Sequence, residues 1–136
     1  EPTAGLDPTE RNRFHNLLSE IGENVIVILS THIVEDVSDL CSHMAIIKDG
    51  EVRLIGEPMG LIKGLTKQVW TGLVDKKDYK SIKNDYQLIS SKLYMGKVQV
   101  RLLDDGQPME GFEQTSPEIE DIYFATINEL DAGSES

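Results

Sequence analysis

Apolar residues near the start of the chain recur at the spacing of a helix. The repeat consists of Phe14, Leu17, Leu18 and Ile21. Intervals of three and four residues place such side chains on one helical face. Asp7 and Pro8 precede the repeat as a good N-cap and first helical residue, and Glu10 can complete a capping box. The pattern predicts a helix over residues 8–21 that ends at Gly22.

A continuous apolar run, residues 25–29, follows this helix and leads into Ser30 and Thr31. Mostly β-branched runs of this kind are typical of a strand buried on both faces in a parallel sheet. A second helix is expected over residues 33–42. We expect it to turn Ile33, Val37, Leu40 and Cys41 inward and Glu35, Asp36 and Asp39 outward. Helix, buried strand and helix together predict an α/β fold. His15 is expected at the surface.

Two apolar runs, residues 44–47 and 52–55, flank the pair Asp49-Gly50. An Asp-Gly pair in this position is a strong signal for a β-hairpin. A short helix is expected over residues 59–65, and a linker follows near Thr66 and Lys67.

The second half of the chain alternates strand and helix patterns. The expected elements are a strand at 68–74, a lysine-rich helix at 75–85, a hairpin of 88–95 with 97–103, and a short strand at 112–115. Ser116 and Pro117 are expected to open a last helix, and the tail after Ala132 is expected to be disordered. We therefore predict one domain over residues 1–66, a small α+β module over 67–131 and a disordered end at 132–136.

The composition argues against some classes of function but identifies none. The 136 residues carry a net charge of −11, which argues against a nucleic-acid surface. The single cysteine, Cys41, cannot form an intramolecular disulfide, which favours a reducing compartment. Charge is uneven, since residues 76–101 hold seven cations and two anions, and no Lys or Arg follows Asp104. This distribution fits either two solvated faces or a basic face that meets an acidic helix.

Two segments carry the candidate chemistry. Glu1 begins the stretch EPTAGLDP, and His32 is the third residue of the stretch STHIVEDVSDLCSHMAIIKDGEVRLIGEP, residues 30–58. A lone Glu or His is usually structural. Together, in this order and at this spacing, the two stretches resemble the glutamate, the D-loop, the switch histidine and the closing strand pair of ABC ATPases. The resemblance implies that residues 1–66 are the C-terminal part of a P-loop NTPase domain of the ABC type. We therefore expect the chain to be a C-terminal fragment of a longer protein, and this fragment starts at the glutamate before the D-loop.

The resemblance also implies roles for individual residues. Glu1 would polarise the attacking water as a general base, and His32 would hold the γ-phosphate and that water in line. Ala4, Gly5, Leu6 and Asp7 would form the D-loop, which crosses the interface between two ATP-binding domains. The implied partners are a second ATP-binding subunit and an integral membrane permease. The implied location is cytoplasmic, at the inner face of the cell membrane, and no nucleic acid partner is expected.

Other parts of the family pattern do not occur in these 136 residues. These 136 residues contain no phosphate-binding Gly-rich loop with its Lys, no glutamine loop, no signature motif and no Mg²⁺-binding Asp before Glu1. ATP and Mg²⁺ are thus expected as cofactors of the full-length protein, while this chain alone is expected to bind no cofactor or metal and to be inactive.

The residues after 66 resemble the family less closely. Pro117–Tyr123 is similar to the last helix of extensions found in bacterial exporter ATPases, which favours an exporter. A dimerisation or regulatory module and a soluble ABC ATPase outside transport remain as alternatives. Because an apolar strand edge tends to find a partner, copies of the chain are expected to associate through residues 25–30 or through the C-terminal module.

Overall fold

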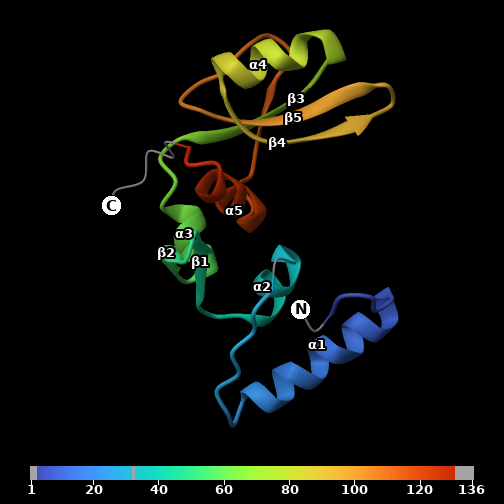
Figure 1. Cartoon of the computed structure of the whole chain (residues 1–136), viewed down its shortest axis with the longest axis vertical. Coiled ribbons are helices and arrows are strands. Elements are labelled where there is room, and N and C mark those ends of the chain that lie inside the picture. The colour runs from blue at the N-terminus through green and yellow to red at the C-terminus, as the bar shows by residue number, and fades with distance from the viewer. Residues whose placement is uncertain (1–2, 32, 131–136) are drawn as a thin grey trace.

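The computed structural model describes residues 3–31 and 33–130 of the chain. Its elements follow the chain from α1 at one end to a sheet at the other, with helix α5 between them (Figure 1). The helical segments are α1 (Pro8–Gly22), α2 (Val34–Leu40), α3 (Pro58–Lys63), the 3-10 helix η1 (Lys76–Asp78), α4 (Tyr79–Asp85) and α5 (Ile119–Ile127). The strands are β1 (Met44–Lys48), β2 (Glu51–Gly56), β3 (Gln68–Val74), β4 (Gln87–Tyr94), β5 (Lys97–Asp104) and β6 (Glu113–Thr115).

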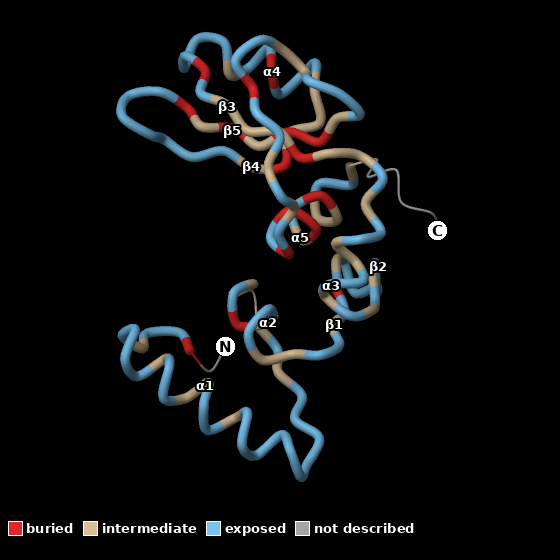
Figure 2. Tube along the Cα trace, turned by 180° about the vertical axis from the view of Figure 1, so that it is seen from behind, coloured by how far each residue is buried: buried red, intermediate tan, exposed pale blue. Residues whose placement is uncertain are grey.

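Helix α1 begins as the sequence predicts. The side chain of Asp7 accepts a hydrogen bond from the amide of Glu10, and Pro8 occupies the first helical position. The helix runs one residue further than expected, through Gly22, and Glu23 is its C-cap. None of the residues of α1 is buried (Figure 2). Within its apolar stripe Phe14 and Leu18 are half-buried, while Leu17 and Ile21 are 51% and 42% exposed, so the stripe is only partly covered in the described structure.

Strands β1 and β2 form an antiparallel hairpin around Asp49 and Gly50. Both turn residues have positive φ, 53° and 76°, as a two-residue type I′ turn requires. The turn therefore lies where the sequence predicts it. Helix α3 follows directly and packs on the same side as Leu54.

The second sheet contains four strands in the order β4-β5-β3-β6, all antiparallel. Val98, Val100 and Leu102 alternate along β5 with polar residues, as predicted, and all three are buried. They face α4 and the ring of Phe112. The other face of the sheet buries Val69 and Leu103, so the sheet is packed on both sides.

Helix α5 lies between the hairpin and the sheet (Figure 1). Ile119 and Ile122 pack against Ile46 of β1, while Asp121 accepts two hydrogen bonds of 2.7 Å from Arg101 of β5. Of the basic residues in 76–101, Arg101 therefore contacts the acidic last helix, as the second interpretation of the charge distribution expected. The predicted cap is wrong, because the helix begins two residues after Pro117 with Glu118 as its N-cap. Glu118 and Asp121 form a reciprocal capping box, which satisfies two helix-end amides.

The strand predicted at residues 25–30 is absent, and both sheets are antiparallel. Ile26 and Ile28 are 95% and 92% exposed, so this segment is not buried either. A strand needs a neighbour that pairs with its backbone, and no strand lies beside this segment within the described ranges. The apolar composition of this segment does not by itself provide a strand with which its backbone can pair. The expected tail, 132–136, lies outside the described residues.

Candidate functional site

The stretch expected to form the D-loop is a turn on the surface. The amide of Leu6 donates to the carbonyl of Thr3 at 3.2 Å, and Gly5 has a φ of +81°, which favours glycine. A Cβ at Gly5 would meet no atom within 4 Å. Ala4, Gly5 and Asp7 are exposed, and Leu6 is half-buried. The turn is therefore open on its outer side and continuous with the start of α1.

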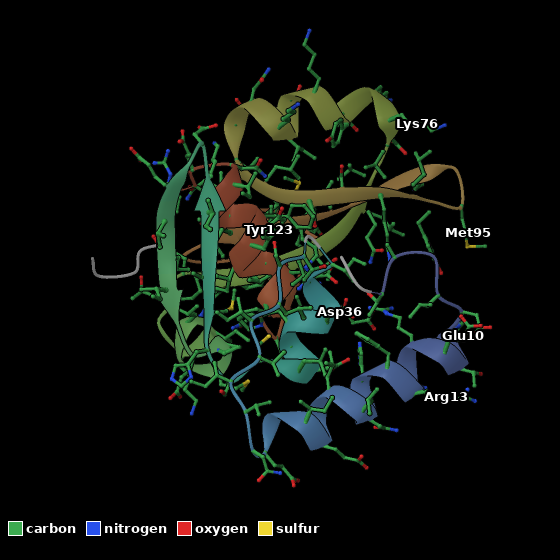
Figure 3. The ribbon with its side chains drawn as sticks, turned by 60° about the horizontal axis from the view of Figure 1, so that its bottom comes forward. Glu10, Arg13, Asp36, Lys76, Met95 and Tyr123 are labelled. Atoms are coloured by element: carbon green, nitrogen blue, oxygen red, sulfur yellow. The ribbon has the colours of Figure 1, made fainter. Side chains whose placement is uncertain are left out.

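One buried carboxylate connects this turn to α2. Asp36 has no exposed surface, and its Oδ2 accepts a hydrogen bond of 2.5 Å from the hydroxyl of Thr3. Its Oδ1 accepts one of 2.8 Å from Nη2 of Arg11. Figure 3 shows Asp36 on α2, beside α1. Three segments that are separate in sequence thus meet at a single side chain.

His15 completes this cluster of Thr3, Arg11, His15 and Asp36, which we call the Asp36 cluster. Nε2 of His15 lies 2.9 Å from Oδ1 of Asp36, and Nδ1 of His15 lies 3.7 Å from Oδ2 of Asp39. The His15 side chain is only 13% exposed. The expectation that His15 is a surface residue is therefore wrong, because the carboxylate of Asp36 gives its ring a polar partner inside the α1–α2 contact.

The expectation that Asp36 points outward is also wrong. Asp36 lies three residues after Ile33 and four before Leu40, so it shares the inward face with them. The spacing was visible in the sequence. It was missed because an acidic residue was assigned to the solvent face by its type alone. The inward side of α2 therefore carries a carboxylate among apolar residues.

The electrostatics of the cluster favour an ionised Asp36. Burial on its own disfavours the charged form, but hydrogen bonds from Thr3, Arg11 and His15 outweigh it and hold the pKa of Asp36 below its ordinary value. The hydrogen bond that Arg11 donates to Asp36 raises the pKa of Arg11, with a smaller contribution from Glu35. Burial, followed by the charge of Asp36, raises the pKa of the Cys41 thiol. The site thus holds a fixed negative charge under its surface.

The two predicted catalytic residues, Glu1 and His32, lie outside the described residues. Their neighbours are described. Thr3 follows Glu1 by two positions, and Asp36 follows His32 by four. The hydroxyl of Thr31 accepts a hydrogen bond from the amide of Ile33 at 2.9 Å, which fixes the turn into α2. The contact between Thr3 and Asp36 therefore brings together the segments that carry Glu1 and His32.

Within residues 3–31 and 33–130, no group of three or more His, Cys, Asp or Glu side chains is arranged to hold a metal ion. No helix in these ranges is both long enough and apolar enough to cross a bilayer.

The chain is similar to proteins named as ABC transporters or as ATP-binding proteins of such transporters. The uncharacterized ABC transporter ATP-binding protein YxlF of Bacillus subtilis (strain 168) is 28% identical over 145 aligned positions, which cover 94% of this chain and 48% of YxlF. ABC transporter A family member 11 of Dictyostelium discoideum is 40% identical over 58 residues, which are 43% of this chain and 7% of that protein.

A third similar protein is the energy-coupling factor transporter ATP-binding protein EcfA2 of Clostridioides difficile (strain 630). It is 37% identical over 65 residues, which cover 46% of this chain and 23% of EcfA2. The chain thus spans about half the length of YxlF and less of the other two. No family model matches the chain.

Proposed function

We propose that this chain is the C-terminal part of an ATP-binding subunit of an ABC transporter. The full-length subunit hydrolyses ATP with Mg²⁺ and couples hydrolysis to a membrane permease, from the cytoplasmic side of the membrane. It works as one of a pair of ATP-binding subunits. We further propose that the transporter is an exporter, on the likeness of Pro117–Tyr123 to exporter extensions.

The Asp36 cluster is the observation that carries this proposal. ATP hydrolysis needs a base and a phosphate-contacting group that are held in a fixed mutual position. In this chain, Glu1 is the proposed base and His32 the proposed phosphate contact, and the contact between Thr3 and Asp36 joins their two segments. A buried carboxylate with a charged partner on another helix has few alternative positions, because any movement leaves a buried charge without hydrogen bonds. The cluster is therefore suited to fix this geometry.

The exposed turn supports the second part of the proposal. Ala4, Gly5, Leu6 and Asp7 are proposed as the D-loop, and the structure leaves its outer side free for a second subunit. The exposed apolar residues of 25–28 fit the same picture. Two of them are almost fully exposed, and contiguous apolar exposure usually marks an interaction site. We propose that the remainder of the ATP-binding domain covers this segment in the full-length subunit.

Single substitutions in the full-length subunit test the hydrolytic role. Glu1→Gln removes the proposed base with little change in size, and loss of a general base lowers the rate by about 10²–10⁴-fold. We expect such a loss of ATP hydrolysis in Glu1→Gln and in His32→Ala, measured as phosphate release. Glu20→Gln, an exposed carboxylate on α1, is the matched control and should hydrolyse ATP normally.

The same measurement can reject the proposal. If Glu1→Gln retains the hydrolysis rate of the unaltered subunit, Glu1 is not the base. This chain alone should neither bind ATP in calorimetry nor release phosphate. ATP hydrolysis by the 136 residues, lost in His32→Ala, would contradict the proposed division of the active site.

A further inference from the structure

The turn between β4 and β5 presents apolar side chains to solvent. Leu93, Tyr94 and Met95 are 71%, 49% and 88% exposed. Figure 3 shows Met95 at the tip of the hairpin, directed away from the body of the molecule. We call residues 92–95 the hairpin tip. Such consecutive apolar exposure has no packing role within the described part of the chain.

Met95 also has an unusual backbone conformation. Its φ is +48°, and the φ of Gly96 is +81°. Two-residue turns of this kind favour Asn or Asp before Gly, and other residues with a side chain are strained in the left-handed region. Methionine at this position therefore weakens the turn without adding a contact inside the molecule. A contact with another molecule would explain its presence.

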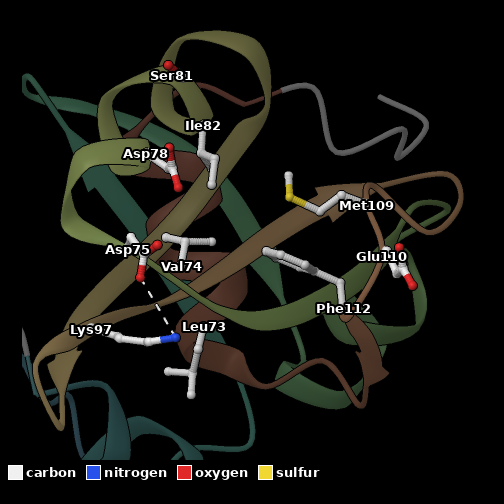
Figure 4. Close-up of a pocket in the computed structure, with 10 residues that line it drawn as sticks. All are labelled: Leu73, Val74, Asp75, Asp78, Ser81, Ile82, Lys97, Met109, Glu110 and Phe112. Carbon is white, nitrogen blue, oxygen red and sulfur yellow. Dashed lines mark ion pairs between the residues drawn. The ribbon is translucent and has the colours of Figure 1, made fainter.

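A cleft of matching character lies close to the hairpin. It has a volume of about 300 Å³ (Figure 4). Its lining includes the buried side chains of Ile82 and Phe112 and the half-buried Met109. The exposed charged residues of the lining are Asp75, Asp78, Glu110 and Lys97. The cleft is thus apolar where it is buried, and its exposed lining carries three carboxylates and one ammonium group.

The charges of the two features are complementary. Lys92 on the tip is exposed, as are Asp78 and Glu110 in the cleft lining, and none of these three forms an ion pair in the described structure. Lys97, beside the tip, pairs with Asp75 at the cleft over 3.7 Å. Tip and cleft are therefore neighbours on one side of the molecule.

We propose that the cleft receives the hairpin tip of a second copy of this chain. Met95 of one copy would fill the apolar part of the other copy's cleft, and Lys92 would pair with an exposed carboxylate of its lining, Glu110 or Asp78. Because every copy carries both features side by side, a two-fold arrangement forms both contacts in one interface. This association does not depend on the proposed ATPase role.

The interface is small, and small interfaces of this kind give weak, concentration-dependent association. Sedimentation equilibrium of the 136-residue chain should show a monomer–dimer equilibrium. Met95→Asn should weaken it by at least about tenfold, which corresponds to about 1.4 kcal/mol. The same change relieves the turn strain, so the variant should unfold at the same or a higher temperature. Met59→Asn, at a methionine that is 63% exposed on α3, is the matched control.

A charge exchange tests the pairing itself. Lys92→Glu should weaken the dimer, and adding Glu110→Lys should restore at least part of the lost affinity. Lys80→Glu, an equal charge change on the exposed side of α4, should have a smaller effect. A chain that stays monomeric at all concentrations, or a dimer that Met95→Asn leaves intact, would overturn the proposal. An equal loss of affinity in Lys80→Glu and Lys92→Glu, without rescue, would also overturn it.

Discussion

The two ends of the molecule are held together by different physical means. Before strand β1, the only described residues that are buried are Thr3 and Asp36, and they are hydrogen-bonded to each other. In the sheet β4-β5-β3-β6, by contrast, the buried residues are apolar and fill both faces. The first region depends on a few directional polar contacts, and the second depends on apolar burial. Polar contacts fix a geometry, while apolar burial supplies most of the stability of a fold.

The two regions therefore have different roles, one in the proposed site and one in the stability of the fold. The region of the Asp36 cluster carries the proposed catalytic segments and leaves much of its apolar surface exposed, so it is suited to complete a larger domain. The sheet region has its own apolar core, so we expect it to retain its fold when the first region is loosened. Helix α5 connects them, since Val34 of α2 packs against its apolar residues and its Asp121 accepts a hydrogen bond from Arg101 of the sheet.

Leu102→Ala should have the largest effect on stability. The side chain of Leu102 is fully buried between the sheet and α4. Truncation of such a residue leaves a cavity and lowers the free energy of unfolding by about 2–5 kcal/mol. Chemical denaturation followed by circular dichroism measures this loss. Leu93→Ala, at a leucine that is 71% exposed, is the control and should change stability little. Equal losses in the two variants would contradict an apolar core in this region.

Gly72→Ala should destabilise the same region by overpacking. A Cβ at this position would lie 2.7 Å from two ring atoms of Phe112, which is closer than non-bonded carbon atoms approach. Overpacking of a core costs about 1–3 kcal/mol. The double variant Gly72→Ala with Phe112→Leu should lose less stability than the two single changes added together, because the smaller side chain removes the clash. Simple additivity in denaturation experiments would show that the ring does not limit residue 72.

Asp36→Ala should loosen the first region without unfolding the second. The substitution leaves Thr3, Arg11 and His15 without their shared acceptor, and a lost acceptor of this kind costs about 1–3 kcal/mol. Hydrogen exchange should therefore become faster at the amides of α1 and α2 and stay unchanged in β3 and β5. Glu20→Ala, at an exposed carboxylate on α1, is the matched control. Faster exchange throughout the sheet would show that the two regions do not unfold separately.

Acid should produce the smallest and most gradual change. The pKa of Asp36 lies below its ordinary value, because hydrogen bonds from Thr3, Arg11 and His15 outweigh the opposing effect of burial. The stability that this carboxylate contributes is therefore fully present above the ordinary aspartate pKa of about 3.9 and is lost as the pH falls through the lower folded-state value. Titration of the Asp36 carboxyl carbon by NMR measures that value. A midpoint at or above the ordinary one would contradict the described bonding.

The sequence predicted those elements whose patterns depend on local rules. Asp7, Pro8 and the apolar stripe located α1, the pair Asp49-Gly50 located the first hairpin, and the alternation of Val98, Val100 and Leu102 located β5. These signals depend on residues within a few positions of one another. They are therefore readable without knowledge of the rest of the fold.

Features that depend on distant contacts were missed. Residues 25–30 have the composition of a buried strand, but a strand forms only beside another strand. Asp36 was assigned to solvent because its three hydrogen-bond partners come from residues 21 to 33 positions away in the chain. The N-cap of α5 is Glu118 and not Ser116, because the Glu118–Asp121 capping box also aims Asp121 at Arg101. The sequence therefore indicated the segments of the candidate site but not the buried contacts of Asp36 that join them.

We propose that the Asp36 cluster fixes the positions of the segments that carry Glu1 and His32. ATP hydrolysis by the full-length subunit with Asp36→Asn tests it most directly. Misplacement of reacting groups by about 1 Å costs on the order of 10²-fold in rate. We therefore predict a fall of that order in the turnover number with ATP affinity retained, while Asp85→Asn on α4 hydrolyses ATP normally. An Asp36→Asn subunit with an unchanged turnover number would contradict the claim.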